Sequence, residues 1–159
     1  MAANTFSAAF VRTTDGWSGA EVDLSEAEIV DDLGDAVTEA LGLSGDELAL
    51  LCVEVEDEWF AIARYFGEDE PRVFLSDAHA IAPDSLGELF AEFAGVVPDK
   101  EGTNTLGVRP AGDFELLSDL GLSSEELLEL SMEEGVLPAD VLSVIAERLS
   151  FGDELDRLR

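Results

Sequence analysis

The sequence is poor in cysteine, histidine and lysine, which supply many metal ligands and catalytic groups in proteins. It contains one cysteine, one histidine and one lysine, which are Cys52, His79 and Lys100. A single cysteine cannot form an internal disulfide, and one cysteine with one histidine cannot supply the clustered ligands of a zinc site. The longest apolar runs are much shorter than the roughly 20 residues that span a bilayer. These absences exclude an internal disulfide, a zinc centre and a membrane helix.

Signatures of phosphate and calcium binding are also missing. No glycine-rich loop is followed by a lysine, no dinucleotide fingerprint occurs, and no twelve-residue window fits a calcium loop. We therefore predict no cofactor and no bound metal. Residues 1–6 lack the basic stretch and long apolar run of a secretion signal, so we expect a cytoplasmic protein.

Acidic side chains are abundant instead. The chain of 159 residues has 37 Asp and Glu against 8 Lys and Arg, a net charge of −29, yet 47% of its residues are hydrophobic. Disorder requires low hydrophobicity as well as high charge, so this charge belongs to the surface of a folded protein. Such a surface repels nucleic-acid phosphates and anionic lipids and attracts basic proteins. We predict a basic protein partner, with no direct binding of nucleic acid or membrane.

The first part of the chain shows the two-residue alternation of β-strands and the 3.6-residue period of an amphipathic helix. Alternating apolar residues around a Thr-Asp-Gly turn predict a β-hairpin over residues 6–22. Ser25 and Glu28 fit a capping box at the start of an amphipathic helix that ends at Gly42. Three further strands are expected, over residues 48–55, 59–66 and 72–75. The strand 59–66 is apolar on both faces apart from Arg64, so it is predicted to be central.

Periodicity lapses between residues 95 and 112, and helical patterns return afterwards. We predict an α+β domain over residues 1–95, a linker or long loop over 96–112, and a small helical region over 113–159. The helices of this last region are short, so they are expected to pack on one another and on the sheet. The predicted fold is α+β: a mostly antiparallel sheet of about five strands, one main helix and a helical C-terminal region.

Two kinds of side chain are candidates for binding a partner. The polar face of the predicted helix is acidic, and two tryptophans stand beside predicted hairpin turns, one of them preceded by acids. Tryptophan is common in protein interfaces, although most tryptophans close a core. The candidate partner-binding residues are Trp17, Glu28, Asp31, Asp32, Asp35, Glu39, Asp57 and Trp59.

Carboxylates also allow an enzyme as an alternative. The acidic clusters 56–58 and 68–70 lie at opposite ends of an eight-residue strand, roughly 25 Å apart, so they cannot share one site. An enzyme acting through other carboxylates would show side chains that converge in a pocket with shifted pKa values, whereas a binding protein would carry dispersed acids on a convex surface. A third alternative is a nucleic-acid mimic that inhibits an RNA-binding enzyme.

Several motifs in one order resemble a known family, the actinobacterial tRNA adenosine deaminase-associated proteins. The resemblance covers nearly the whole chain except the linker. It rests on Thr14-Asp-Gly-Trp17, Asp57-Glu-Trp-Phe60, residues 71–78, Gly112-Asp113, residues 117–122, Ile145-Ala-Glu-Arg-Leu149 and Phe151-Gly152.

The resemblance implies association with a tRNA adenosine deaminase, because the family is named for genes that lie beside the gene of that enzyme. It offers no catalytic residues. The zinc signature of the deaminase itself, His-x-Glu followed by Pro-Cys-x-x-Cys, is absent, since Ala80 and Ile81 follow His79. We therefore expect a non-enzymatic accessory protein that binds a basic partner, with the deaminase as the candidate.

Overall fold

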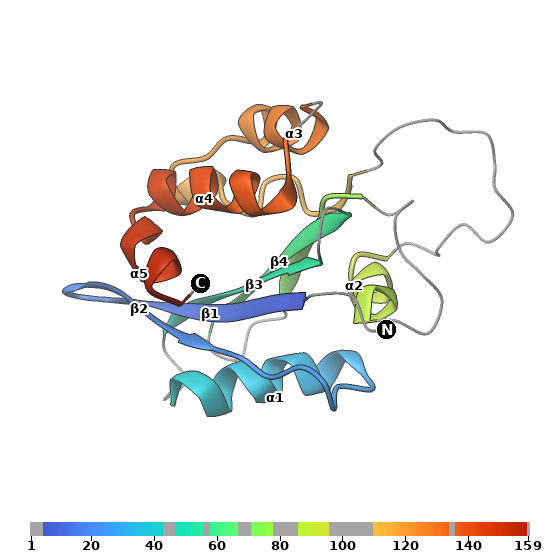
Figure 1. Cartoon of the computed structure of the whole chain (residues 1–159), viewed down its shortest axis with the longest axis vertical. Helices are drawn as coiled ribbons and strands as arrows, with labels where there is room; N and C mark the ends of the chain where they lie inside the picture. The colour runs from blue at the N-terminus through green and yellow to red at the C-terminus, as the bar shows by residue number, and fades with distance from the viewer. Residues whose placement is uncertain are drawn as a thin grey trace, which may run out of the picture.

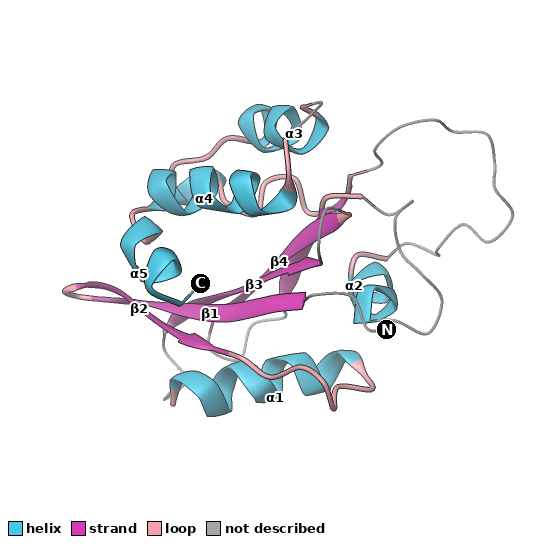
Figure 2. Ribbon diagram, viewed as in Figure 1, coloured by secondary structure: helices cyan, strands magenta, loops and turns pink. Residues whose placement is uncertain are grey.

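The protein is described from a computed structural model over residues 5–42, 47–55, 58–66, 71–77, 86–95, 110–133 and 136–158. Within these residues one antiparallel sheet has six strands in the order β2-β1-β3-β4-β5-β6 (Figure 2). The strands are β1 (Thr5–Thr13), β2 (Gly16–Glu21), β3 (Leu48–Val55), β4 (Trp59–Phe66), β5 (Arg72–Leu75) and β6 (Ala111–Gly112). The predicted α+β class is confirmed, with a sheet slightly larger than expected.

Helices cover both faces of this sheet, giving three layers (Figure 1). One face packs against α1 and α2, and the opposite face packs against the C-terminal helices. The helices are α1 (Val30–Leu41), α2 (Leu86–Phe93), α3 (Ser124–Met132), α4 (Pro138–Leu149) and α5 (Gly152–Leu158), with a 3₁₀ turn, η2, at Ser118–Leu120.

The central strands are buried on both sides, as the double apolar pattern of β4 predicts. Residues of β3 alternate between the two layers: Leu51 and Val53 contact the α1 side, whereas Leu50 and Cys52 contact the C-terminal helices. Cys52 is buried, as expected for a cysteine in an apolar strand. Arg64, the polar exception in β4, is paired through two hydrogen bonds of 2.6 and 2.8 Å with Asp119 of η2.

The start of α1 differs from the prediction. Ser25 does not cap the helix, which starts five residues after it; the backbone N–H of Ser25 donates to Asp23 Oδ1 (3.0 Å). The helix begins at Val30, where the carboxylate of Asp32 accepts hydrogen bonds from the backbone N–H groups of Glu28 (2.8 Å) and Ile29 (3.1 Å). The carboxylate of Asp32 in the first turn thus satisfies N–H groups at the start of the helix, a role that the predicted capping box assigned to Ser25 and Glu28.

In the C-terminal region, Ser123 with Glu126 three residues later predicts the start of one helix and Pro138 predicts the start of another, and both predictions are confirmed. Ser123 Oγ accepts from the backbone N–H of Glu126 (3.3 Å) at the start of α3, and Pro138 occupies the first turn of α4. Strand β6 occupies the last two residues of the predicted linker. Its pairing with β5 is extended by the N–H of Asp113, which donates to the carbonyl oxygen of Val73 (2.7 Å).

Candidate partner-binding surface

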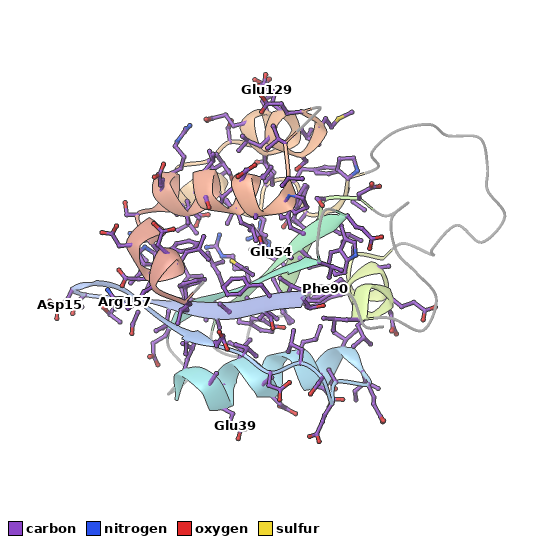
Figure 3. The ribbon with its side chains drawn as sticks, in the orientation of Figure 1. Asp15, Glu39, Glu54, Phe90, Glu129 and Arg157 are labelled. Carbon is purple, nitrogen blue, oxygen red and sulfur yellow. The ribbon has the colours of Figure 1, made fainter. Side chains whose placement is uncertain are left out.

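The outer face of α1 carries a stripe of exposed carboxylates. Asp31, Asp35 and Glu39 are exposed and follow one another at intervals of four residues, which places them on one side of the helix about 6 Å apart along its axis. Figure 3 shows Glu39 projecting from α1 away from the body of the protein. We call these three residues the α1 acidic stripe.

The apolar side of α1 fixes the direction in which this stripe points. Leu33 and Val37 are fully buried against the sheet. Gly34 lets the helix approach β4 closely, because a Cβ at this position would lie 3.2 Å from Cε1 of Tyr65. With Leu33, Val37 and Gly34 held against the sheet, the acidic stripe is left on the solvent side.

No positive charge of the described residues neutralises the stripe. The ion pairs in this part of the protein join Arg64 to Asp119, Arg72 to Asp113, Arg148 to Glu126 and Arg157 to Glu154. None of these pairs involves α1. Its charges therefore face solvent without a cationic side chain among the described residues.

Two of the predicted acids differ from the stripe. Asp32 is partly buried and its carboxylate caps the helix; the hydrogen bond from the backbone of Glu28, and then that from Ile29, lowers the pKa of Asp32. The carboxylate of Asp32 is thus engaged in hydrogen bonds that cap α1, and we do not count it in the stripe. Glu28 precedes the helix and is exposed beside the stripe.

The two tryptophans occupy different environments. Trp59 is 3% exposed and packs against Phe90 of α2, with ring centroids 5.9 Å apart, so it closes the core and has no area to offer a partner. Trp17 is only partly buried and packs against Phe151 at 5.0 Å. Asp57 lies outside the described residues.

Sequence reasoning missed one apolar residue beside the stripe. The spacing of Ile29 with Leu33 and Val37 predicts that it lies on the apolar face of the helix, but it is 56% exposed. The reason is its place at the N-cap, where the backbone is extended (φ −132°, ψ 164°) and the side chain leaves the helical spiral. Ile29 and Glu28 together put an apolar contact next to the charges, which is a common composition for a protein interface.

The described carboxylates are dispersed and do not converge on one centre. Within the described ranges, no group of three or more His, Cys, Asp or Glu residues is placed to hold a metal ion. Glu39 and Glu129 project at opposite ends of the view in Figure 3.

Carboxylates with a lowered pKa have local structural partners instead. The hydrogen bonds from Arg64 hold the pKa of Asp119 below its usual range, and the hydrogen bond from Arg148 does the same for Glu126. The first ion pair joins η2 to β4 and the second joins α3 to α4, so both shifts arise from contacts that hold elements of the fold together. In the described segments, no helix is both long and apolar enough for a bilayer crossing.

Residues 5–152 match the family described as Rv3753c-like tRNA adenosine deaminase-associated protein. The chain belongs to this family. A relative in Mycobacterium tuberculosis, Protein Rv3753c, is 37% identical over 109 residues, which are 65% of this chain and 59% of the mycobacterial protein. No solved structure matches the chain. The family confirms the resemblance seen in the sequence, and its name refers to association with the deaminase.

Tyr65, beneath α1, provides a spectroscopic test of how the acidic helix is seated. Its hydroxyl is buried without a hydrogen-bond partner among the described residues, and burial first, then the charge of Asp31, raises the pKa of Tyr65 well above its ordinary value of 10.0. Because the folded state holds this proton more tightly than the unfolded state, the contribution of Tyr65 to stability is constant below about pH 10 and falls above it, by about 1.4 kcal/mol per pH unit.

Tyr65 is the only tyrosine in the chain, so tyrosinate absorbance reports on it alone. We expect no ionisation near pH 10 and a steep absorbance rise only where circular dichroism shows unfolding. Titration near pH 10 in the folded protein would contradict this seating of α1. The protein in denaturant, where Tyr65 should titrate normally, is the control.

Proposed function

We propose that this protein is a non-catalytic accessory protein that binds a basic partner through the α1 acidic stripe, and that the partner is a tRNA adenosine deaminase. The observation that carries the proposal is the stripe itself: three exposed carboxylates in register with no described basic side chain to neutralise them. The name of the family supports the choice of partner. A partner that acts on tRNA would also place the protein in the cytoplasm.

The chemistry of such a complex follows from the partner's substrate. An enzyme that binds tRNA must present basic surface, since contacts with phosphates dominate affinity for nucleic acids. A convex acidic helix complements basic surface and steers association through long-range attraction. Ile29 would add a desolvated contact at one end of the charged area. The same net charge of −29 opposes direct binding of tRNA by this protein.

Binding to the purified deaminase of the same organism tests the proposal. The variant Asp31→Asn/Asp35→Asn/Glu39→Gln removes the stripe, and Glu125→Gln/Glu129→Gln/Glu133→Gln removes the same charge from exposed positions on α3 and at its C-cap. In surface plasmon resonance we expect the α1 variant to bind at least about tenfold more weakly, and the α3 variant to bind within about threefold of the unmodified protein. Affinity should also fall as salt is raised.

Two results would overturn the proposal. One is the absence of a complex at micromolar concentrations in low salt. The other is an equal loss of affinity in both variants, which would show that total charge matters and that the stripe does not. Circular dichroism of both variants verifies that the helices remain folded.

Adding tRNA separates an accessory protein from a nucleic-acid mimic. An accessory protein that binds away from the RNA groove should form a complex with the deaminase in the presence of tRNA and leave its KM unchanged. A mimic should be displaced by tRNA and raise the KM for tRNA. The dispersed, convex arrangement of the described acids is compatible with either mode of docking, so this comparison determines the role of the complex.

A further inference from the structure

A cleft of about 370 Å³ lies between the turn of the β1–β2 hairpin and the C-terminal end of α4. In a chain where almost one residue in four is acidic, the described part of this cleft's lining has two arginines and no acidic residue. The sign of the local charge is therefore opposite to that of the protein as a whole. The lining residues are Arg12, Thr13, Thr14, Gly16, Trp17, Leu120, Arg148, Leu149 and Ser150.

Arg12 is the described basic residue that takes part in no ion pair. The other described arginines each contact a carboxylate, as the pairs above show. In the cleft, Arg148 is neutralised by Glu126, and its Nη2 also donates to the carbonyl oxygen of Gly121 (3.5 Å). The guanidinium of Arg12 is left to provide about one unit of positive charge.

The strand register places Arg12 beside an aromatic surface. Arg12 is directly opposite Trp17 in the β1–β2 pair, and residues opposite each other in a sheet share a face. That face is the one occupied by Phe10, two residues before Arg12, and by the C-terminal helices. Trp17 packs against Phe151, with ring planes tilted by 50°, so the indole is held in place next to the guanidinium.

The two sides of the cleft are held by local backbone structure. Thr13 Oγ1 donates to the carbonyl oxygen of Gly16 (2.9 Å) and accepts from the N–H of Asp15 (3.3 Å), which fixes the hairpin turn. Ser150, at the end of α4, is in the left-handed region with φ of 77°, a conformation that costs a residue other than glycine of order 1 kcal/mol. This residue is the C-cap of α4, where the N–H groups of Ser150 and Phe151 donate to the carbonyl oxygens of Glu147 and Ala146 and end the helix.

We propose that this cleft binds a small organic anion with a single carboxylate on a flat apolar body. Guanidinium groups match carboxylates through paired, charge-assisted hydrogen bonds, which Arg12 is free to make. Trp17, Leu120 and Leu149 supply the apolar surface for the body of the ligand. The cleft volume lies within the range of small-molecule sites. At physiological ionic strength, charges more than about 8 Å away are largely screened, so the unpaired charge of Arg12 acts on a ligand in the cleft despite the net charge of the protein.

Three probes of one shape and different charge test the proposal: 1-naphthoate, the neutral 1-naphthamide and the cationic 1-naphthylmethylammonium. Binding to the full chain is followed by calorimetry and by the indole N–H signals in NMR, at about 150 mM salt. We expect 1-naphthoate to bind about tenfold more tightly than the amide, and the cation to bind most weakly. The indole signal of Trp17 should shift and that of the buried Trp59 should not.

A matched pair of variants locates the binding site. Arg12→Gln should abolish the preference for naphthoate over naphthamide, whereas Arg157→Gln, which removes the same charge at an ion pair with Glu154 outside the cleft, should preserve it. Equal affinity for all three probes, tighter binding of the cation, or loss of the preference in both variants would overturn the proposal. No deaminase is present in this experiment, so its outcome is independent of the proposed function.

Discussion

Replacing Phe151 by alanine is expected to lower the free energy of unfolding by about 3–5 kcal/mol, a large part of the stability of a domain of this size. Phe151 is 1% exposed and lies where the C-terminal helices meet the sheet. Its ring stacks on Phe10 with centroids 4.5 Å apart and also contacts Trp17 at 5.0 Å. Truncation would leave a cavity next to both partners, and rigid strands can close it only in part.

Urea unfolding followed by tryptophan fluorescence and by circular dichroism measures this loss. Phe66→Ala provides the control, because Phe66 is 50% exposed at the end of β4 and should cost less than about 1 kcal/mol. Similar losses in the two variants would contradict the packing described. Coincident transitions by both probes are also expected, since residues of β1 and of the C-terminal helices share one core. Separate transitions would instead support an independent module at residues 113–159.

Gly112→Ala is expected to cost at least about 3 kcal/mol and to unpair β6 from β5. Gly112 has φ of 100°, and a Cβ there would lie 2.3 Å from the carbonyl oxygen of Val73, an overlap that only a backbone shift can relieve. That carbonyl also accepts the hydrogen bond from the N–H of Asp113, so the shift would break this bond as well. Amide hydrogen exchange at Asp113 should become much faster.

Gly95→Ala separates the cost of conformation from the cost of the clash. Gly95 also has a positive φ, 77°, but a Cβ there would meet nothing within 4 Å. This variant should lose only about 1 kcal/mol, the usual cost of alanine in left-handed backbone. If both variants lost the same amount, the close approach of Gly112 to β5 would be wrong.

Local sequence patterns predicted the helices and strands whose buried residues recur with a regular period. The central position of β4 followed from its apolar pattern, and the caps of α3 and α4 followed from Ser123 and Pro138. The partner of Arg64 did not follow, because Asp119 is 55 residues away and only the folded chain brings them together. Strand β6 was missed for a similar reason: two residues carry no periodicity, and they are held by contacts with β5.

The candidate binding features divide in the same way. The α1 acidic stripe was predictable, since three acids at intervals of four lie on one side of any helix. The residue at which α1 starts was not predictable, because Ser25 and Asp32 both satisfy local rules for helix capping. Only contacts in the folded chain decide between them. The exposure of Trp17 and the burial of Trp59 depend on which helix covers each ring. The cleft lies between a hairpin turn and the end of a helix more than 130 residues later, so no local sequence pattern could predict it.

The sheet separates these two surfaces, since α1 covers one of its faces and the side chain of Arg12 shares the other with the C-terminal helices. A macromolecule docked on α1 and a small anion beside Arg12 would therefore occupy opposite faces of one sheet. Coupling between two such ligands would have to cross β1, a strand whose middle residues are buried on both sides.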